Sequence, residues 1–274
     1  LQTLALDWNA NPDILDSKLL PSEKAEFISL LERRINEKVP TSYLLNLAYF
    51  CEKPYYVDER VLIPRSPIAE LINNRFAPYC LDENHQPREA ANNLPENAQP
   101  KMPRRILDMC TGSGCIAIAL AYAFPEAEVD ATDISKEALE VAAINAEHHN
   151  KQFEVALLES DLFSKIPAEN QYDLIVSNPP YVAEDDPHLQ QGDLRFEPEM
   201  ALSAGEHGMV CITHIINAAP GYLCKEGWLL LEHGYDQAES CRQLLRDRDF
   251  SNICSYPDLA GIMRVSGGQL SSSI

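Results

Sequence analysis

The tetrad Asn178-Pro179-Pro180-Tyr181 contains the residues whose chemistry is easiest to infer. A flat amide or amine nitrogen reacts poorly because its lone pair is delocalised, so a catalyst must hold its N–H groups with acceptors. Asn178 offers a side-chain carbonyl, and Pro179 offers a backbone carbonyl in a stiff segment without a competing N–H donor. Tyr181 could pack against the flat group. The tetrad therefore predicts a site in which Asn178, Pro179 and Tyr181 act and Pro180 contacts the substrate, with a rigid Pro-Pro turn as the alternative.

A loop further upstream has the composition of a site for a nucleotide-like ligand. Asp108 leads into Cys110-Thr111-Gly112-Ser113-Gly114, where glycines let backbone approach a ligand and a following helix offers free N–H groups. Asp133 lies 21 residues after Gly112, a distance at which a carboxylate accepts both ribose hydroxyls of an adenosine. Asp161 could accept from the adenine amino group while Leu162 packs on the ring. The predicted cofactor-binding residues are Asp108, Cys110, Thr111, Gly112, Ser113, Gly114, Asp133, Asp161, Leu162 and Asn178.

Two alternatives apply to this loop. A tight strand-to-helix turn would also need its glycines, and dehydrogenases share the loop and the carboxylate at Asp133. Dehydrogenases rarely share the tetrad at Asn178, so the combination of both features favours transfer to a planar nitrogen.

Alternating strands and helices must position these residues. Short apolar strands are expected at 105–109, 129–133, 153–158, 172–177 and 228–232, and helices at 116–123, 135–148 and 208–223. This alternation predicts an α/β fold with a doubly wound, mostly parallel sheet, which binds ligands at the carboxyl ends of its strands. Residues 81–104 are rich in Pro, Asn, Glu and Gln and indicate a mobile insertion. The tail from Ser266 to Ile274 is expected to be flexible.

The first 65 residues have a different character. Ala25, Ile28, Leu31 and Ile35 recur at helical spacing and predict one apolar helix face. Residues 1–52 are too few for a large core, so we expect a small helical domain that rests on the rest of the chain; the missing initial Met indicates N-terminal truncation. Alternating aromatic and β-branched residues predict a β-hairpin connector at 53–65, followed by the main domain at 66–274.

The composition limits the possible partners. A net charge of −20 argues against direct nucleic-acid binding, which relies on Lys and Arg, and favours a basic protein partner, although acidity also maintains solubility. The longest apolar run, Cys115 to Phe124, is half of what a membrane span needs, and no signal peptide is apparent. The eight cysteines contain no C-x-x-C pair, which predicts reduced thiols in a cytoplasmic protein and no metal site.

Taken together, Asp108-x-x-Thr-Gly-Ser-Gly, Asp133, Asp161 and Asn-Pro-Pro-Tyr resemble the HemK-like protein glutamine N5-methyltransferases. Val61-Leu62-Ile63-Pro64-Arg65 and Phe196-Glu197-Pro198 are further marks of that family, and the resemblance covers nearly the whole chain. It implies a class I, Rossmann-like methyltransferase fold with a seven-stranded sheet, behind a small helical domain that recognises the protein substrate. It also implies S-adenosyl-L-methionine as cofactor and S-adenosyl-L-homocysteine as product. Arg65 and Glu197 are then candidates for substrate binding at its entrance, or for a structural ion pair.

The two ends of the chain resemble different branches of this family. The stretch Ile63 to Ile72 and the loop Leu107 to Cys115 are similar to the branch that methylates a large-subunit ribosomal protein, the third of the L series. Asp186 to Pro198 and Leu231 to Gln237 resemble the branch that methylates the Gly-Gly-Gln motif of release factors. We weight the N-terminal half more, because the small domain is the implied recognition element and an acidic enzyme suits a basic ribosomal protein.

Three other hypotheses remain at this point. Adenine N6 and guanine N2 methyltransferases of nucleic acids also use an Asn- or Asp-Pro-Pro-aromatic loop, because they face the same delocalised nitrogen. A binding protein could keep the cofactor fold without activity, although it would not need the tetrad. The Gly267-Gly268-Gln269 triplet in the tail could enter a neighbouring molecule's site as a pseudo-substrate.

Overall fold

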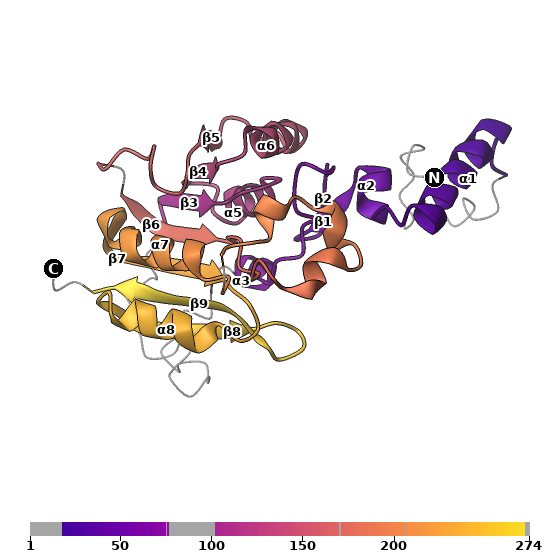
Figure 1. The fold of residues 1–274 in the computed structure, drawn as a ribbon. Helices are drawn as coiled ribbons and strands as arrows, with labels where there is room; N and C mark the ends of the chain where they lie inside the picture. Colours follow the sequence, from indigo (N-terminus) through magenta and orange to yellow (C-terminus); the bar gives the residue numbers. More distant parts are fainter. Residues whose placement is uncertain (1–17, 75, 77–101, 170, 206, 272–274) are drawn as a thin grey trace.

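A seven-stranded sheet forms the centre of the structure, a computed structural model that describes residues 18–74, 76, 102–169, 171–205 and 207–271 (Figure 1). Its strand order is β5-β4-β3-β6-β7-β9-β8, in which β9 runs antiparallel to both neighbours and the other pairs are parallel. The strands are β3 (Arg105–Met109), β4 (Glu128–Asp133), β5 (Val155–Glu159), β6 (Tyr172–Ser177), β7 (Leu223–Glu232), β8 (Phe250–Pro257) and β9 (Met263–Leu270). The predicted α/β fold with a mostly parallel, seven-stranded sheet is confirmed.

Successive residues of a strand point to opposite sides of the sheet, so both faces of this sheet carry apolar side chains. Helices cover both faces. In β3, Ile106 packs with α3 (Ile68–Asn73) and α5 (Cys115–Ala123), while Leu107 packs on the other face. That second face is covered by α7 (Val210–Ala218) and α8 (Ala238–Arg246). The remaining helix of the main domain, α6 (Lys136–His148), lies beside α5 (Figure 1), and short 3-10 helices lie at Pro187–Gln190, Leu194–Phe196, Glu199–Ala201 and Ala219–Gly221.

The N-terminal helix α1 (Pro21–Asn36) projects away from the sheet and is joined to it through α2 (Thr41–Leu45) (Figure 1). The carboxylate of Glu23 accepts from the N–H of Leu20 at 2.7 Å and so caps the start of α1. Within the described part of the chain no residue of α1 is buried, and Ile28 and Leu31 are exposed. The predicted apolar face therefore exists, and it is open to contact from outside.

The chain between α2 and α3 is held against α6 by a small cluster of apolar side chains. Tyr43 of α2 and Val57 and Val61 of the connecting segment pack with Ala138 and Val141 of α6. The hydroxyl of Tyr43 donates to the carbonyl of Val61 at 2.6 Å. This cluster ties the N-terminal part to α6 of the main domain.

The predicted β-hairpin connector at 53–65 is wrong in its position. The hairpin is formed by β1 (Ala48–Phe50) and β2 (Lys53–Tyr55), and residues 56–65 contain no strand. The β-branched and aromatic residues that suggested a strand are explained by burial: Val57 and Val61 insert into the cluster against α6, and Tyr56 and Ile63 are partly buried against it. Side-chain burial, without backbone pairing, produces the same pattern of residue types.

Two predicted segments lie outside the described residues. They are residues 1–17 of the N-terminal domain and the insertion at 81–104, of which the structure describes only 102–104. Among the residues that are described, every helix is too short or too polar to span a bilayer.

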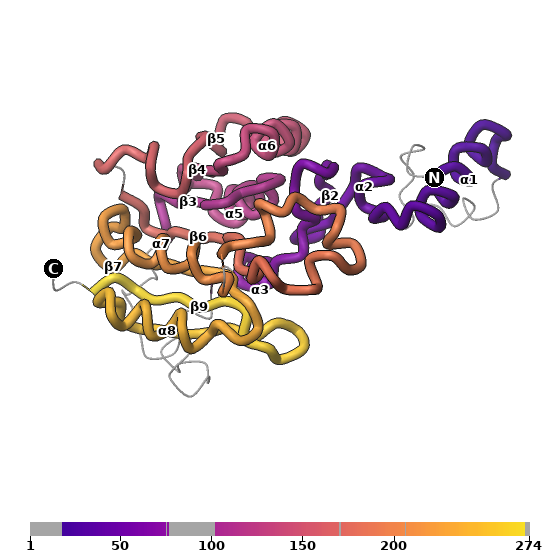
Figure 2. The backbone as a smooth tube through the Cα atoms, viewed as in Figure 1, coloured from indigo at the N-terminus to yellow at the C-terminus, as the bar shows by residue number. Residues whose placement is uncertain are grey.

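The prediction of a flexible tail from Ser266 is wrong for residues 266–270. They belong to β9, which runs beside β7 (Figure 2). Because β9 lies between β7 and β8, Gly267 pairs with both Leu230 and Cys254. Glycine is required here because a Cβ at position 267 would lie 2.3 Å from the carbonyl oxygen of Leu229. The Ser- and Gly-rich composition reflects close packing in a sheet, and the paired Gly267-Gly268-Gln269 triplet is not a free pseudo-substrate.

We predict that Gly267→Ala destabilises the protein by about 1–3 kcal/mol, because the new methyl group must displace backbone. Gly221→Ala is the matched control, since a Cβ there meets no atom within 4 Å, and should change stability by less than about 0.5 kcal/mol. Urea unfolding followed by circular dichroism measures both. Equal stability of the two variants would contradict the placement of the tail inside the sheet.

Candidate active site

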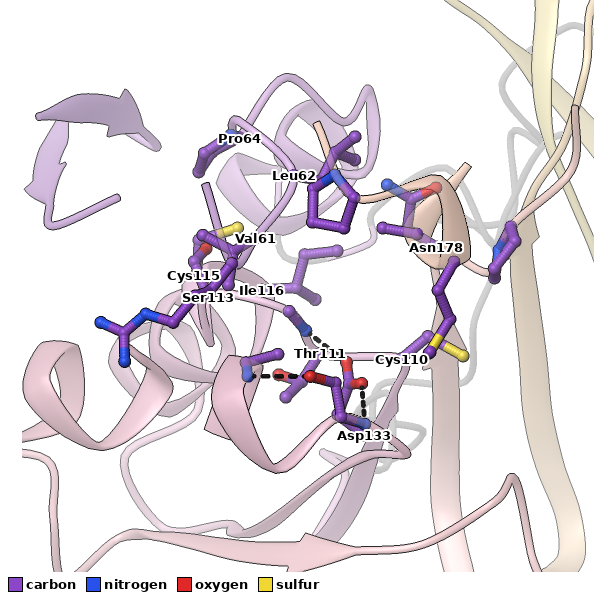
Figure 3. A pocket seen from close by; sticks show the side chains of 18 of the residues that line it. Val61, Leu62, Pro64, Cys110, Thr111, Ser113, Cys115, Ile116, Asp133 and Asn178 are labelled. Carbon is purple, nitrogen blue, oxygen red and sulfur yellow. Dashed lines mark hydrogen bonds between the residues drawn. The ribbon is translucent and has the colours of Figure 1, made fainter. Parts of the chain in front are cut away.

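The pocket lies at the carboxyl ends of β3, β4 and β6 and encloses about 870 Å³, its open mouth included. Asp133 lies at the bottom of the view in Figure 3 and Asn178 at the upper right, with Thr111 and Cys110 between them. The lining residues are Arg60, Val61, Leu62, Pro64, Arg65, Ser66, Cys110, Thr111, Gly112, Ser113, Cys115, Ile116, Asp133, Ile134, Ser135, Ala138, Asn178, Pro180, Pro198, Met200 and Ala201. Five separate segments of the chain, within 60–66, 110–116, 133–138, 178–180 and 198–201, therefore build one site.

The sequence predicted a part of this lining. Predicted site residues that line the pocket are Arg65, Cys110, Thr111, Gly112, Ser113, Asp133, Asn178 and Pro180. Predicted site residues that the structure places outside the lining are Asp108, Gly114, Asp161, Leu162, Pro179, Tyr181 and Glu197. Each of these residues has its own position in the fold relative to the pocket.

The loop after β3 has a backbone that few residue types allow. Gly112 and Gly114 have φ values of +54° and +78°, which glycine adopts without strain. A Cβ on Gly112 would meet no atom within 4 Å, so its bare backbone faces open space, whereas one on Gly114 would lie 3.1 Å from Cβ of Ala142. Gly112 thus leaves backbone exposed to a ligand, and Gly114 lets α5 begin close against α6.

Asp133, the last residue of β4, is fixed by the loops that it joins. One carboxylate oxygen accepts from the N–H of Gly112 at 2.9 Å, and the other accepts from the N–H of Ser135 at 2.9 Å (Figure 3). Burial raises the pKa of this carboxyl, while these N–H groups oppose the rise. Each oxygen keeps a second lone pair, so Asp133 can still accept from ribose hydroxyls at the pocket.

Asp108 lies directly beneath the same loop and is completely buried. Its Oδ2 accepts from the hydroxyl of Thr111 at 2.5 Å and from the N–H of Ala117 at 3.0 Å. Its Oδ1 has no hydrogen-bond partner among the described residues. Burial raises the pKa of this carboxyl to about 7, against the opposing effect of the two donors. Asp108 therefore supports the loop from below, through Thr111 and Ala117, and does not face the pocket.

The tetrad follows β6 and comes beside the loop after β3, because Ser177 pairs with Met109. The hydroxyl of Ser177 also donates to the carbonyl of Met109 at 2.7 Å. Asn178 and Pro180 face the pocket, whereas Pro179 is buried. Tyr181 points its hydroxyl away from the lining, toward Glu232 at 2.8 Å. The expected stacking of Tyr181 on a substrate remains a prediction.

Arg65 and Glu197 form an ion pair at the pocket's edge. The two guanidinium nitrogens of Arg65 donate to the two carboxylate oxygens of Glu197 at 2.6 Å each. The side chain of Glu197 is 0% exposed and that of Arg65 is 47% exposed, so only the arginine reaches solvent. Of the two predicted roles, the geometry favours a structural pair that fixes Arg65 at the rim.

Asp161 and Leu162 come after β5, next to the end of β4. The N–H of Ser160 donates to the carbonyl of Asp133 at 2.9 Å, which holds this turn beside the cofactor loop. Asp161 is exposed and Leu162 is half-buried. Their predicted contacts with adenine remain a prediction.

Two buried polar residues of the site, Asn145 and Glu232, were not predicted from the sequence. Asn145 of α6 is completely buried, accepts from the N–H of Tyr56 at 2.7 Å, and donates to the carbonyls of Tyr56 and Ser113 at 2.9 and 2.8 Å. Glu232 ends β7 and accepts from Tyr181. Asn145 could have been found as a polar residue within the apolar positions of α6. Glu232 could not, because its partner Tyr181 lies 51 residues away in the sequence. Among the described residues, no group of three or more His, Cys, Asp or Glu side chains is arranged to hold a metal ion.

Comparisons with known proteins show which proteins this chain is similar to. A family model described as the methyltransferase small domain matches residues 88–195. The ribosomal protein uL3 glutamine methyltransferase of Bordetella pertussis is 42% identical over 223 residues, covering 81% of this chain and 69% of that protein. The release factor glutamine methyltransferase of the same bacterium is 42% identical over 250 residues, covering 91% of this chain and 84% of that protein.

Solved structures support the fold. A methyltransferase from Pyrococcus furiosus matches with a TM-score of 0.54 at 15% identity, covering 92% of this chain and 100% of that one. The 16S rRNA N2 G1207 methyltransferase of Thermus thermophilus, solved with AdoMet and guanosine, matches with a TM-score of 0.50 at 16% identity, covering 82% and 49%. At these identities they show the fold alone.

The sheet order, the loop after β3 and the tetrad after β6 define an S-adenosylmethionine-dependent methyltransferase of class I. Within that class, the chain belongs to the HemK-like family of protein glutamine N5-methyltransferases. The residues present fit the cofactor, because Gly112 offers open backbone and Asp133 offers free acceptor positions. When bound, S-adenosylmethionine supplies an electrophilic methyl group on a sulfonium.

We predict that Asp133→Asn weakens cofactor binding by about 10- to 100-fold, because a hydrogen bond to a charged acceptor contributes about 1.5–3 kcal/mol. Isothermal titration with S-adenosylmethionine measures the dissociation constant. Glu137→Gln is the matched control, since this exposed carboxylate lies in the first turn of α6 and outside the pocket lining. Equal affinities for the two variants would exclude the proposed role of Asp133.

The raised pKa of Asp108 predicts a pH dependence of stability. Because the folded-state pKa of about 7 exceeds the usual value of 3.8, the native state favours the protonated carboxyl. Stability from this group is therefore present at low pH and is lost as pH rises to about 7. The test compares the wild type with Asp108→Asn, both without cofactor. Between about pH 5 and 7 the unfolding free energy of the wild type, relative to that of the variant, should fall by up to about 1.4 kcal/mol per pH unit and then level off. Denaturant titrations at several pH values test this, and parallel profiles for the two proteins would contradict it.

Proposed function

We propose that this enzyme methylates the side-chain nitrogen of a glutamine in the large-subunit ribosomal protein uL3, forming S-adenosylhomocysteine and N5-methylglutamine. The observation that carries the proposal is that Asn178 and the loop Cys110–Ser113 line one pocket. Asn178 lines this pocket beside the loop that fits the cofactor, and its side-chain amide carries an acceptor oxygen (Figure 3). It can hold a glutamine N–H and orient the nitrogen, and orientation supplies up to about 7–11 kcal/mol of barrier reduction.

Proline fixes the rest of this acceptor geometry. Pro179 is buried and Pro180 lines the pocket, so the backbone after Asn178 is stiff and brings no N–H donor of its own. The carbonyl of Pro179 is the proposed second acceptor. In the reaction the glutamine nitrogen gains a methyl group and releases one proton to solvent.

A protein substrate accounts for the N-terminal part of the chain. We assign residues 1–52 to substrate recognition, because α1 projects from the sheet with Phe27, Ile28, Leu31 and Ile35 exposed (Figure 1). The net charge of −20 would draw a basic ribosomal protein toward it. With an acidic chain, direct binding to nucleic acid is not part of the proposal, and we place the reaction in the cytoplasm.

The choice of uL3 rests on the N-terminal half. The stretch Ile63 to Ile72 resembles the ribosomal-protein branch, and its residues Pro64, Arg65 and Ser66 line the pocket, so residues of the branch-like stretch lie within reach of a bound glutamine. A release factor is the second candidate, because Asp186 to Pro198 resembles that branch and also ends at the pocket, with Pro198 in its lining. The two relatives have the same identity of 42% and therefore favour neither.

A labelled methyl-transfer assay that offers uL3, a release factor and total RNA side by side tests the proposal. We expect label in uL3 on a glutamine side chain, located by peptide mass spectrometry. Label in the release factor alone would reverse the choice of substrate, and label in RNA alone would overturn the protein-substrate proposal.

Asn178→Ala should abolish transfer in this assay while cofactor affinity stays within about threefold, because the lost acceptor serves the substrate nitrogen. Asn217→Ala is the matched control, since this Asn lies on α7 and its side chain accepts from Arg248. Undiminished turnover by Asn178→Ala would refute the assigned role of the tetrad.

A further inference from the structure

Glu232 is a buried carboxylate that touches two walls of the site. It is 5% exposed and ends β7, two strands along the sheet from β3. Its Oε1 accepts from the hydroxyl of Tyr181 at 2.8 Å, and its Oε2 accepts from the hydroxyl of Ser66. Tyr181 belongs to the tetrad, and Ser66 belongs to the wall in front of α3.

We infer that Glu232 is a positioning residue for methyl transfer: by holding Tyr181 and Ser66 together, it sets the tetrad against the wall that carries Arg65. This inference rests on the proposed function, because it assigns Glu232 to the glutamine end of the same site. The residue does not line the pocket, so it acts through its two partners.

The buried carboxylate of Glu232 needs a hydrogen-bond donor for each of its oxygens. A buried carboxylate is costly unless its oxygens are hydrogen-bonded, and here each oxygen receives one hydroxyl. Burial raises the pKa of Glu232, while its two donors and the guanidinium groups of Arg264 and Arg65 favour the charged form. An apolar residue could fill this space more cheaply, so the contact is better explained by what it positions than by stability.

The backbone of Tyr181 is held by the turn that follows Glu232 at the end of β7. The side-chain amide of Gln237 donates to the carbonyl of Tyr181 at 3.0 Å, and its oxygen accepts from the N–H of Gly234 at 2.7 Å. The N–H of Tyr181 donates to the carbonyl of Leu202 at 3.1 Å. Hydroxyl, carbonyl and amide of this tyrosine are thus all fixed, which leaves the three preceding residues little freedom.

Ser66 carries the positioning to the opposite wall. Its hydroxyl oxygen also accepts from the N–H of Ile68 at 3.2 Å, at the start of α3. The neighbouring Arg65 is paired with Glu197, which comes from the segment after the tetrad. Glu232 and Glu197 therefore hold the segment Arg65–Ser66 from two sides, and both link it to the chain that follows β6.

The test uses Glu232→Gln, Tyr181→Phe and the double variant, with whichever protein the wild type methylates. Gln keeps the size of the side chain but replaces one acceptor oxygen by a donor, so the two hydroxyls are no longer both accepted. We expect kcat to fall by about tenfold or more in each single variant, with KM for the protein and the dissociation constant for S-adenosylmethionine within about threefold. The double variant should be no slower than the slower single variant, because both substitutions break one contact.

Asp130→Asn is the matched control. Asp130 accepts from the hydroxyl of Tyr172 at 2.7 Å, which is the same type of contact at the opposite, amino-terminal end of β6. It should leave kcat unchanged, even if its melting temperature falls as far as that of Glu232→Gln.

The outcomes separate the two proposals. Glu232→Gln with wild-type kcat, independent losses that multiply in the double variant, or an equal loss of kcat in Asp130→Asn would each overturn the positioning role. A wild type that methylates neither uL3 nor a release factor would overturn the proposed function, and the inference with it.

Discussion

The parallel pairing of β3 with β6 is the constraint on which the site depends. Met109 lies opposite Ser177, so the residues that follow, Cys110 and Asn178, emerge side by side at one edge of the sheet. The helices after these strands lie on opposite faces, which opens a crevice where the chain changes direction. A shift of one residue in this pairing would turn every side chain of β6 to the other face and remove Asn178 from the pocket. The bond from Ser177 to Met109 reinforces the register.

The N-terminal part of the chain is an integral wall of the site. Asn145 holds the backbone of Tyr56 and of Ser113 together, so the connecting segment and the cofactor loop share one buried amide. Further along, Arg65 and Ser66 reach across to side chains that come after the tetrad. The residues that resemble the two branches of the family therefore meet in one pocket, and neither end of the chain determines its shape alone.

Local patterns predicted the parts of the fold that depend on local chemistry. Strands 105–109 and 172–177 were predicted to the residue. Each is a short apolar run, and the residues that follow it, a glycine-containing loop in one case and Asn-Pro-Pro in the other, do not continue a strand. The tail and the hairpin were wrong for a shared reason: burial of Gly267 and Val57 is decided by distant neighbours. Among site residues, the loop Cys110–Ser113 and Asn178 could be found from motifs, whereas Glu232 depends on Tyr181 and Ser66, far away in the sequence.

The position of β9 has a consequence for the synthesis of this protein. Because β9 lies between β7 and β8, the edge of β7 has no neighbour on that side until residues 263–270 have left the ribosome. During elongation this edge offers unpaired N–H and C=O groups, which other chains can pair with. Of the strands that the structure describes, the last along the chain is thus the one that closes the interior of the sheet. Truncation before Met263 would cost the protein an interior strand and leave β8 without the strand that it pairs with.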